Sequence, residues 1–210
     1  MASSLPSMSE KRKMPSSDNV NGNQPKKNHW SAGLSAAVDD ESIQVYKDDL
    51  CTVINDKFPK AGIHLLVIPN ENITNLKSVN NAHLSLLKHM LKVGKETAEK
   101  VAAKANACGS FAHFRYGYHA IPSMSLLHMH VISQDFISDS LKTKKHWNSF
   151  TSDYFLDASQ VIDDLQANGC IRVDTIRMGK LLDNELKCHR CSNNFKTMPK
   201  LKQHLLMHTS

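Results

Sequence analysis

The stretch Leu126-Leu127-His128-Met129-His130-Val131-Ile132-Ser133 decides how this chain folds. Its apolar and β-branched residues predict a strand over 126–133. Successive side chains of a strand point to opposite faces of the sheet. One face then carries both imidazoles, and the other carries only apolar or small side chains: Leu127, Met129, Val131 and Ser133. The pattern therefore predicts a core strand that presents two histidines on a single face.

The rest of the chain predicts an α+β fold around this strand. Further strands are predicted over 50–55, 63–68 and 111–118, and helices over 79–107 and 153–166. The long helix has an apolar stripe, and the second helix ends at an Asn-Gly turn. Strands and one long helix in this order favour an antiparallel sheet covered by helix.

Composition narrows the class of protein. The chain has 210 residues and a net charge of +6, which favours polyanionic partners. Its five cysteines are scattered and odd in number, which argues against a disulfide framework. We find no apolar signal segment and no run long enough to cross a bilayer. We therefore expect a soluble intracellular protein with no membrane association.

Three parts are predicted along the chain. Residues 1–28 read as a disordered tail, rich in Ser, Asn, Pro and Lys. Two basic clusters in it, Lys11-Arg12-Lys13 and Lys26-Lys27, are spaced like a split nuclear-import signal, so we expect a nuclear protein. Residues 29–150 would form the main domain, and 151–210 a helical extension with a zinc finger.

A zinc site is predicted near the end of the chain. Four residues have the ligand spacing of a ββα finger: Cys188, Cys191, His204 and His208. Phe195 and Leu201 fall where such a finger has its small core. Zinc supplies most of the folding free energy of such fingers, so we expect a structural zinc ion here.

The paired strand histidines suit chemistry at phosphorus. A neutral imidazole is a good nucleophile near pH 7 and can form a covalent nucleotidyl intermediate. A second imidazole can donate a proton to the leaving oxygen. The turn at Ile121-Pro122-Ser123 could bring His119 alongside His128. Two other interpretations stay open for His128 and His130: a packed core pair, or a metal site.

Longer segments resemble the histidine-triad superfamily of nucleotide hydrolases. They are residues 117–125, with the sequence GYHAIPSMS, and residues 128–136, with the sequence HMHVISQDF. Residues 46–48, 56–61 and 145–150, together with the zinc finger, fit one branch of that superfamily. The resemblance spans roughly residues 29–208 and implies a histidine-triad fold joined to a ββα finger.

That branch removes AMP from adenylated DNA 5′ ends, which abortive ligation leaves behind. The resemblance implies that His128 attacks the AMP phosphorus and carries the nucleotide. His119 would protonate the departing 5′-phosphate, and His130 would stabilise the transition state. Water would then hydrolyse the adduct. This scheme requires no catalytic metal.

The resemblance also implies substrate contacts beyond the triad. Ser123 would hold the phosphate, Asp56 the ribose hydroxyls and Lys60 a DNA phosphate, while Phe58, Trp30 and His64 would lie against the DNA end or the nucleotide. Each also has a purely structural interpretation, as a turn residue, a solvated charge or a packed ring. The expected partners are nicked or broken DNA ends with 5′-AMP, AMP as product, and possible repair proteins.

Two other functions compete with this one. A small-molecule histidine-triad hydrolase or phosphoramidase would use the same imidazoles, although the finger and the basic tail argue against it. A non-catalytic DNA-end binder is favoured only by Leu126, which stands where many superfamily members have a third histidine.

Overall fold

The computed structural model describes Leu34 and residues 37–208, so Trp30 and the predicted tail lie outside the described residues. Six strands form one sheet in the order β1-β2-β3-β5-β4-β6, with every neighbouring pair antiparallel. They are β1 (Gln44–Lys47), β2 (Cys51–Asn55), β3 (His64–Pro69), β4 (Phe114–His119), β5 (Met129–Ser133) and β6 (Phe155–Asp157). The predicted α+β class and antiparallel sheet are confirmed.

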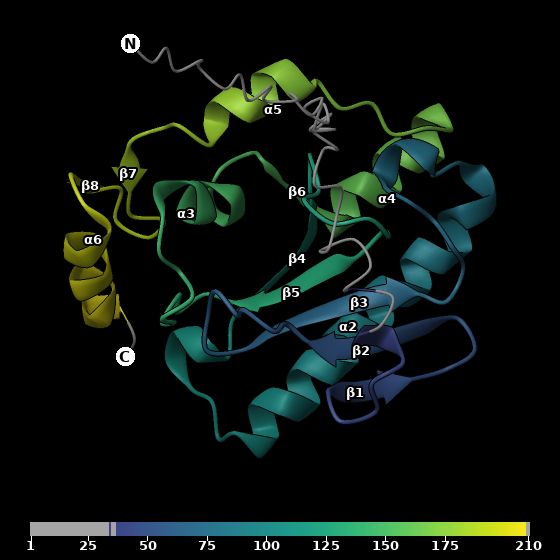
Figure 1. Cartoon of the computed structure of the whole chain (residues 1–210), viewed down its shortest axis with the longest axis horizontal. Helices are drawn as coiled ribbons and strands as arrows, with labels where there is room; N and C mark the ends of the chain where they lie inside the picture. Colours follow the sequence, from purple (N-terminus) through teal and green to yellow (C-terminus); the bar gives the residue numbers. More distant parts are fainter. Residues whose placement is uncertain (1–33, 35–36, 209–210) are drawn as a thin grey trace, which may run out of the picture.

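Helices and a small second sheet complete the fold (Figure 1). The helices are α2 (Leu84–Lys104), α3 (Lys144–Thr151), α4 (Ala158–Asn168), α5 (Thr175–Leu181) and α6 (Met198–Leu205), and the second sheet pairs β7 (Leu186–Lys187) with β8 (Asn194–Phe195). Short 3-10 turns lie at Leu76–Ser78, Asn81–His83, Gly109–Phe111 and Leu206–His208. Within the described ranges, no helix is both long and apolar enough to cross a membrane.

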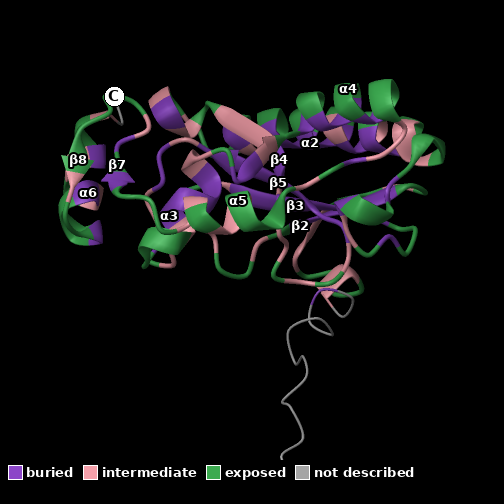
Figure 2. Ribbon diagram, turned by 90° about the horizontal axis from the view of Figure 1, so that it is seen from above, coloured by how far each residue is buried: buried purple, intermediate pink, exposed green. Residues whose placement is uncertain are grey.

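The large sheet separates two apolar layers. Helices α2 and α4 pack against each other over one face, as the edge-on view in Figure 2 shows. Met129 and Val131 of β5 lie in that layer beneath Gly94 of α2, where an added Cβ would come within 2.7 Å of Met129. His130 of β5, and His128 just before the strand, face the other way, as the alternation predicted. The histidines therefore lie on the face opposite α2 and α4.

The second layer joins the zinc finger to the sheet. Ile132 of β5, Phe150 of α3 and Phe155 of β6 belong to one buried cluster with the finger residues Leu186 and Leu201. In Figure 1 the finger, drawn in yellow, lies beyond α3. Trp147 of α3 is fully buried, and its indole Nε1 donates to the Lys187 carbonyl at 3.0 Å. The finger is thus packed onto the main domain through α3.

Three predicted elements differ from the structure. The strand expected from Leu126 begins at Met129, because Leu126 has a left-handed backbone with φ of 79°. The helix expected from 153 starts at Ala158, after β6 has added an edge strand beside β4. The long helix begins at Leu84, after two capped 3-10 turns. Strand pairing and loop geometry decide these boundaries, and the hydrophobic periodicity of the sequence carries no information on either of them.

Close packing at Gly117 yields the first prediction. Gly117 in β4 lies between β5 and β6, and an added Cβ would collide with the Leu156 carbonyl and the Phe155 ring. We expect Gly117→Ala to lower the free energy of unfolding by about 3 kcal/mol in urea titrations. Gly179→Ala is the matched control, since nothing lies within 4 Å of its added Cβ and alanine favours helix α5. Equal effects of the two substitutions would contradict the β4–β6 contact.

Candidate active site

The turn before β5 orients the imidazole of His128. The left-handed residue Leu126 points its carbonyl at His128 Nδ1, 2.8 Å away. A carbonyl can only accept, so Nδ1 carries the proton and Nε2 keeps its lone pair. The ring is 5% exposed, so this lone pair belongs to a buried and oriented base. The turn thus fixes both the orientation and the tautomer of the His128 ring.

A hydrogen-bond relay fixes the protonation of the next imidazole. The main-chain N–H of Lys60 donates to His64 Nδ1 at 3.1 Å, and a backbone N–H can only donate. A neutral His64 must then carry its proton on Nε2, which lies 3.0 Å from His130 Nδ1. His130 accepts there and keeps its own proton on Nε2. Among the described residues that Nε2 has no partner, so the site holds a free N–H donor.

His119 completes the group from the end of β4. Its ring lies 4.4 Å from that of His130, centroid to centroid, and His130 lies 4.9 Å from His128. The turn after β4 thus brings the three imidazoles together, as the sequence suggested. Buried His119 Nε2 also has no partner within the described residues. Two buried ring nitrogens, on His119 and His130, therefore have no hydrogen-bond partner within the described residues.

Phe150 of α3, which sequence reasoning missed, packs against this group. Its ring centroid lies 4.6 Å from that of His119, 5.2 Å from His130 and 5.3 Å from His64. An apolar ring in this position excludes water from one side of the imidazoles. The resemblance over residues 145–150 pointed to this segment without giving Phe150 a role, and α3, begun by the Thr143 cap on His146 N–H, is too short for periodicity to place it.

Burial lowers the pKa of all four imidazoles. It lowers the pKa of His64 to about 4 and that of His119 to about 3, where the nearby positive charges of His128, His64 and Lys60 add to it. Burial also lowers the pKa of His130 well below 6.5. For His128 burial again dominates, although the Leu126 carbonyl and the negative charge of Asp56 partly restore its basicity. All four rings are neutral at pH 7, which suits a nucleophile.

The loop between β2 and β3 brings polar groups to the same place. Asp56 Oδ2 lies 3.6 Å from His64 Nδ1, and Asp56 Oδ1 accepts from the Phe58 N–H at 2.7 Å. The Lys60 ammonium donates to the Phe58 carbonyl, and burial lowers its pKa. Phe58 is 42% exposed at the tip of the loop. The structure thus gathers Asp56, Lys60 and His64 beside the triad, with Phe58 at its rim.

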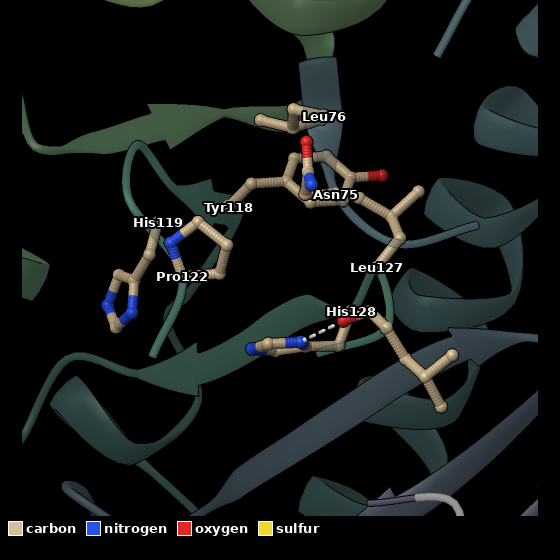
Figure 3. Close-up of a pocket in the computed structure, with 8 residues that line it drawn as sticks. Asn75, Leu76, Tyr118, His119, Pro122, Leu127 and His128 are labelled. Atoms are coloured by element: carbon tan, nitrogen blue, oxygen red, sulfur yellow. Dashed lines mark hydrogen bonds between the residues drawn. The ribbon is translucent and has the colours of Figure 1, made fainter. Parts of the chain in front are cut away.

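The turn from β4 to β5 forms a small hollow next to the triad. Figure 3 shows His119 and His128 on either side of Pro122, with the His128–Leu126 bond dashed. The lining residues are Asn75, Leu76, Tyr118, His119, Pro122, Leu126, Leu127 and His128. Ser123 follows Pro122 with its side chain exposed. Asn75 was missed because it comes from the loop before α2, which carries no motif.

The four predicted zinc ligands converge in the finger. Their ligand atoms all lie within 4.8 Å of one another, with Cys191 Sγ 3.0 Å from His204 Nε2 and the two histidine Nε2 atoms 3.1 Å apart. Zn–N bonds of about 2.0–2.1 Å in a tetrahedron place two nitrogens about 3.3 Å apart. The geometry therefore fits zinc, which would hold β7, β8 and α6 together when bound.

Two other groups of potential ligands are already hydrogen-bonded. Asp48 lies near Cys51 and His89, but its carboxylate accepts from His89, Tyr46 and the N–H groups of Leu50 and Cys51. The second group contains Asp56 with His64 and His130, whose ring nitrogens bond to each other. Within the described residues, the finger is thus the grouping with four potential ligands and the spacing of a zinc site.

Known families match both parts of the chain. Residues 33–146 match the family described as "Scavenger mRNA decapping enzyme C-term binding". Residues 151–210 match the "C2HE / C2H2 / C2HC zinc-binding finger" family. With the geometry above, these matches define a histidine-triad protein that carries a zinc-binding finger.

Similar proteins narrow this class. Aprataxin from Gallus gallus is 49% identical over 86% of this chain and 55% of its own length, and aprataxin from Ciona intestinalis is 48% identical over 86% and 46%. An aprataxin-like protein of Saccharomyces cerevisiae is 32% identical over 80% of this chain and 88% of its own length. The chain belongs to the aprataxin family. It spans about half the length of the animal aprataxins it matches.

A solved structure agrees with this assignment. The aprataxin ortholog Hnt3 in complex with DNA superimposes with a TM-score of 0.68 at 26% identity, covering 84% of this chain and 91% of that one. A second Hnt3 structure, in complex with DNA and guanosine, has a TM-score of 0.57 and 26% identity, over 83% of this chain and 93% of that chain. The likeness therefore includes both the sheet and the finger.

The buried imidazoles predict acid destabilisation. The ordinary histidine pKa of 6.5 is lowered to about 4 for His64 and about 3 for His119. At a pH between the ordinary and the lowered pKa, the unfolded chain binds protons that the folded chain excludes. The free energy of unfolding is therefore highest above pH 6.5 and falls as the pH drops. Urea unfolding should lose up to about 2 kcal/mol per ring between pH 7 and pH 5. His119→Asn should lose less over this interval, and a constant free energy in the wild type would contradict the burial of these rings.

Zinc removal should detach the finger from α3. We expect a strong chelator, or Cys191→Ser, to abolish zinc binding and to expose Trp147, because zinc supplies about 10 kcal/mol or more to such fingers. In a Trp30→Phe background Trp147 is the one remaining tryptophan of the chain, so its emission should shift to the red. Cys108→Ser, another exposed cysteine, is the control and should keep both zinc and the buried emission. An unchanged spectrum after complete zinc loss would disprove the coupling.

Proposed function

We propose that this protein is a DNA 5′-adenylate hydrolase, which removes AMP from broken or nicked DNA ends. One observation carries the proposal: the lone pair of His128 Nε2 and the free N–H of His130 Nε2 belong to adjacent buried rings. A nucleophile beside a donor for charge on phosphate oxygens is what phosphoryl transfer requires. Membership of the aprataxin family, and the DNA bound by the ortholog Hnt3, support DNA as the substrate.

The first step would transfer the adenylyl group to His128. Nε2 attacks the phosphorus of AMP, forming an N–P bond, while the P–O bond to the DNA 5′-phosphate breaks. His130 Nε2–H stabilises negative charge on the non-bridging oxygens, and the hydroxyl of Ser123 helps to hold the phosphate. No group outside the chain is needed for this step.

Protonation of the leaving phosphate falls to His119. In the free protein its pKa is about 3, so the ring enters the reaction neutral. A bound pyrophosphate bridge brings negative charge next to His119, which opposes the effect of burial and favours the imidazolium form. Proton uptake would then accompany substrate binding, and the proton would leave on the DNA 5′-phosphate.

The second step would release AMP. Water takes the place of the departed DNA phosphate, gives a proton to His119, which the first step left neutral, and attacks the same phosphorus, so that the N–P bond breaks. AMP leaves with the new P–O bond, and His128 returns to its neutral form. The net reaction consumes one water and yields AMP and a DNA 5′-phosphate.

The loop between β2 and β3 would recognise the two substrate parts. The carboxylate of Asp56 can accept from the ribose hydroxyls of AMP, and Lys60 brings a positive charge to the DNA phosphate. Exposed Phe58, and Trp30 outside the described residues, would lie against the terminal base pair. His64 has both ring nitrogens bonded to protein groups, so we assign it to positioning His130.

The proposal extends to the setting of the reaction. The zinc finger is proposed to grip DNA next to the break, with zinc bound by Cys188, Cys191, His204 and His208. We retain the division into a tail (1–28), a catalytic part (29–150) and an extension with the finger (151–210). The nucleus is the proposed location, and repair proteins are proposed as further partners.

A 5′-adenylated nick tests the function directly. The wild type should release AMP, and acid-quenched samples should carry AMP on His128 in peptide maps. His128→Ala removes the nucleophile and should lower the rate at least about 10³-fold. His113→Ala is the matched control, since that histidine is exposed at the start of β4.

The same assay separates the competing functions. A wild-type protein that leaves the adenylated nick intact but cleaves adenosine phosphoramidate would be a small-molecule hydrolase. Tight binding of the nick without any adduct or AMP would identify a non-catalytic DNA-end binder. Either result would overturn the proposal.

A further inference from the structure

The zinc finger contacts the loop that follows the catalytic strand. His189 Nε2, between β7 and β8, lies 3.1 Å from the Gln134 carbonyl. On α6, the Lys202 ammonium donates to the Ser138 carbonyl at 2.7 Å. Both acceptors belong to residues 134–143, which lead from β5 to α3. The finger therefore holds the main chain that emerges directly from the triad strand.

The same loop holds the segment between β2 and β3. The Ser138 hydroxyl donates to the Pro59 carbonyl, and buried Asp135 accepts from the Gly62 N–H at 2.8 Å. These bonds fix the main chain on both sides of Lys60. Ser138 thus takes a hydrogen bond from the finger through its carbonyl and passes one to the β2–β3 loop through its hydroxyl.

The next bonds lead into the active site. The Lys60 N–H donates to His64 Nδ1, and His64 Nε2 donates to His130 Nδ1. A shift of the Pro59–Lys60 peptide would weaken the one bond that fixes the tautomer of His64. His130 would then no longer be committed to presenting Nε2–H to the substrate.

We propose that Lys202 is a positioning residue, which couples the folded finger to the triad through Ser138, Pro59, Lys60 and His64. The finger then serves the reaction as well as DNA binding, because its helix α6 braces the loop that sets the proton on His130. The kinetic part of this inference rests on the proposed adenylate hydrolase, whereas the structural part does not.

The ammonium of Lys202 is suited to this internal role. Its side chain is half-buried and bonded to a main-chain carbonyl, whereas Lys200 on the same helix is exposed. A charged donor to a carbonyl makes a stronger hydrogen bond than a neutral one. Lys202→Met keeps the apolar stem and removes the donor, Lys202→Arg keeps a donor, and Lys200→Met removes an equal charge from the exposed surface.

Histidine NMR tests the coupling without any substrate. In the zinc-loaded full chain at pH 7, the ¹⁵N and ¹H signals of the His64 and His130 imidazoles report which nitrogen carries the proton. Lys202→Met should shift or broaden these signals, and Lys202→Arg and Lys200→Met should leave them in place. Ser138→Ala interrupts the path outside the finger and should cause the same change with zinc retained. Unchanged signals in Ser138→Ala would overturn the proposal, whatever Lys202→Met does to the finger.

Single-turnover kinetics provide the second measurement. At saturating adenylated DNA, Lys202→Met and Ser138→Ala should slow formation of the AMP adduct by about tenfold, since small misplacements of catalytic groups are costly. The Kd for DNA should stay within about twofold of wild type in Ser138→Ala, which keeps every surface charge. A loss of affinity with an unchanged rate would assign Lys202 to DNA binding and disprove the coupling. A wild type without any adduct would refute the hydrolase, and the NMR result would still decide the coupling.

Discussion

One main-chain N–H, that of Lys60, determines what the buried imidazoles can offer a substrate. It forces His64 to accept at Nδ1 and therefore to donate from Nε2. If that bond were lost, His64 could carry its proton on Nδ1, and His130 would have to donate to it in return. His130 would then point a lone pair, instead of an N–H, at the oxygens of a phosphate. Whether His130 offers an N–H or a lone pair to phosphate oxygens thus depends on a backbone group in a loop.

This dependence explains why so many contacts converge on the β2–β3 loop. The Asp56 N–H bonds to the His64 carbonyl at 3.0 Å, and the Ile63 N–H bonds to Ser133 Oγ at 2.9 Å. The loop after β5 supplies Asp135 and Ser138, and Lys202 of the finger bonds in turn to the Ser138 carbonyl. A relay of neutral imidazoles needs a rigid main chain around it. An imidazole changes tautomer at little cost in free energy once the group that hydrogen-bonds to it has moved. The finger and the main domain share one buried core, and the proposed coupling would give that core a chemical as well as a structural role.

Burial contributes in two opposite ways. The apolar surroundings that Phe150 and Phe155 provide keep the imidazoles unprotonated, so that His128 can act as a nucleophile at neutral pH. The same surroundings oppose the imidazolium form that a proton donor needs, and burial lowers the pKa of His119, the proposed donor, to about 3. A bound anion resolves the conflict, since its charge favours protonation only where the substrate lies. In the proposed reaction the free site would therefore hold no acid, and the bound substrate would complete it.

Much of the fold was predictable from the sequence, because strand alternation placed His128 and His130 on one face and the finger spacing gathered four ligands. What the sequence did not reveal lies in segments that fold back from elsewhere. Phe150 reaches the triad on a helix too short for periodicity, and β6 pairs with β4 across a long connection. Sequence reasoning could place His64 in a strand, but its function follows from the Lys60 N–H, and a main-chain group leaves no trace in the sequence. Sequence motifs do not show interactions made by backbone atoms. This site depends on two of them, made by the Lys60 N–H and the Leu126 carbonyl.

The second such interaction explains why leucine can stand in the first triad slot. The group that Leu126 gives to the site is its carbonyl, which holds the proton on His128 Nδ1. Its side chain packs with the apolar cluster of Leu34, Ile54, Leu66 and Ile68. The left-handed φ of 79° is unfavourable for a branched side chain, and that packing helps to hold it. A histidine at 126 would bring another imidazole to the rim, yet the orientation of the nucleophile would still come from the backbone, so the side chain at this position is free to serve packing.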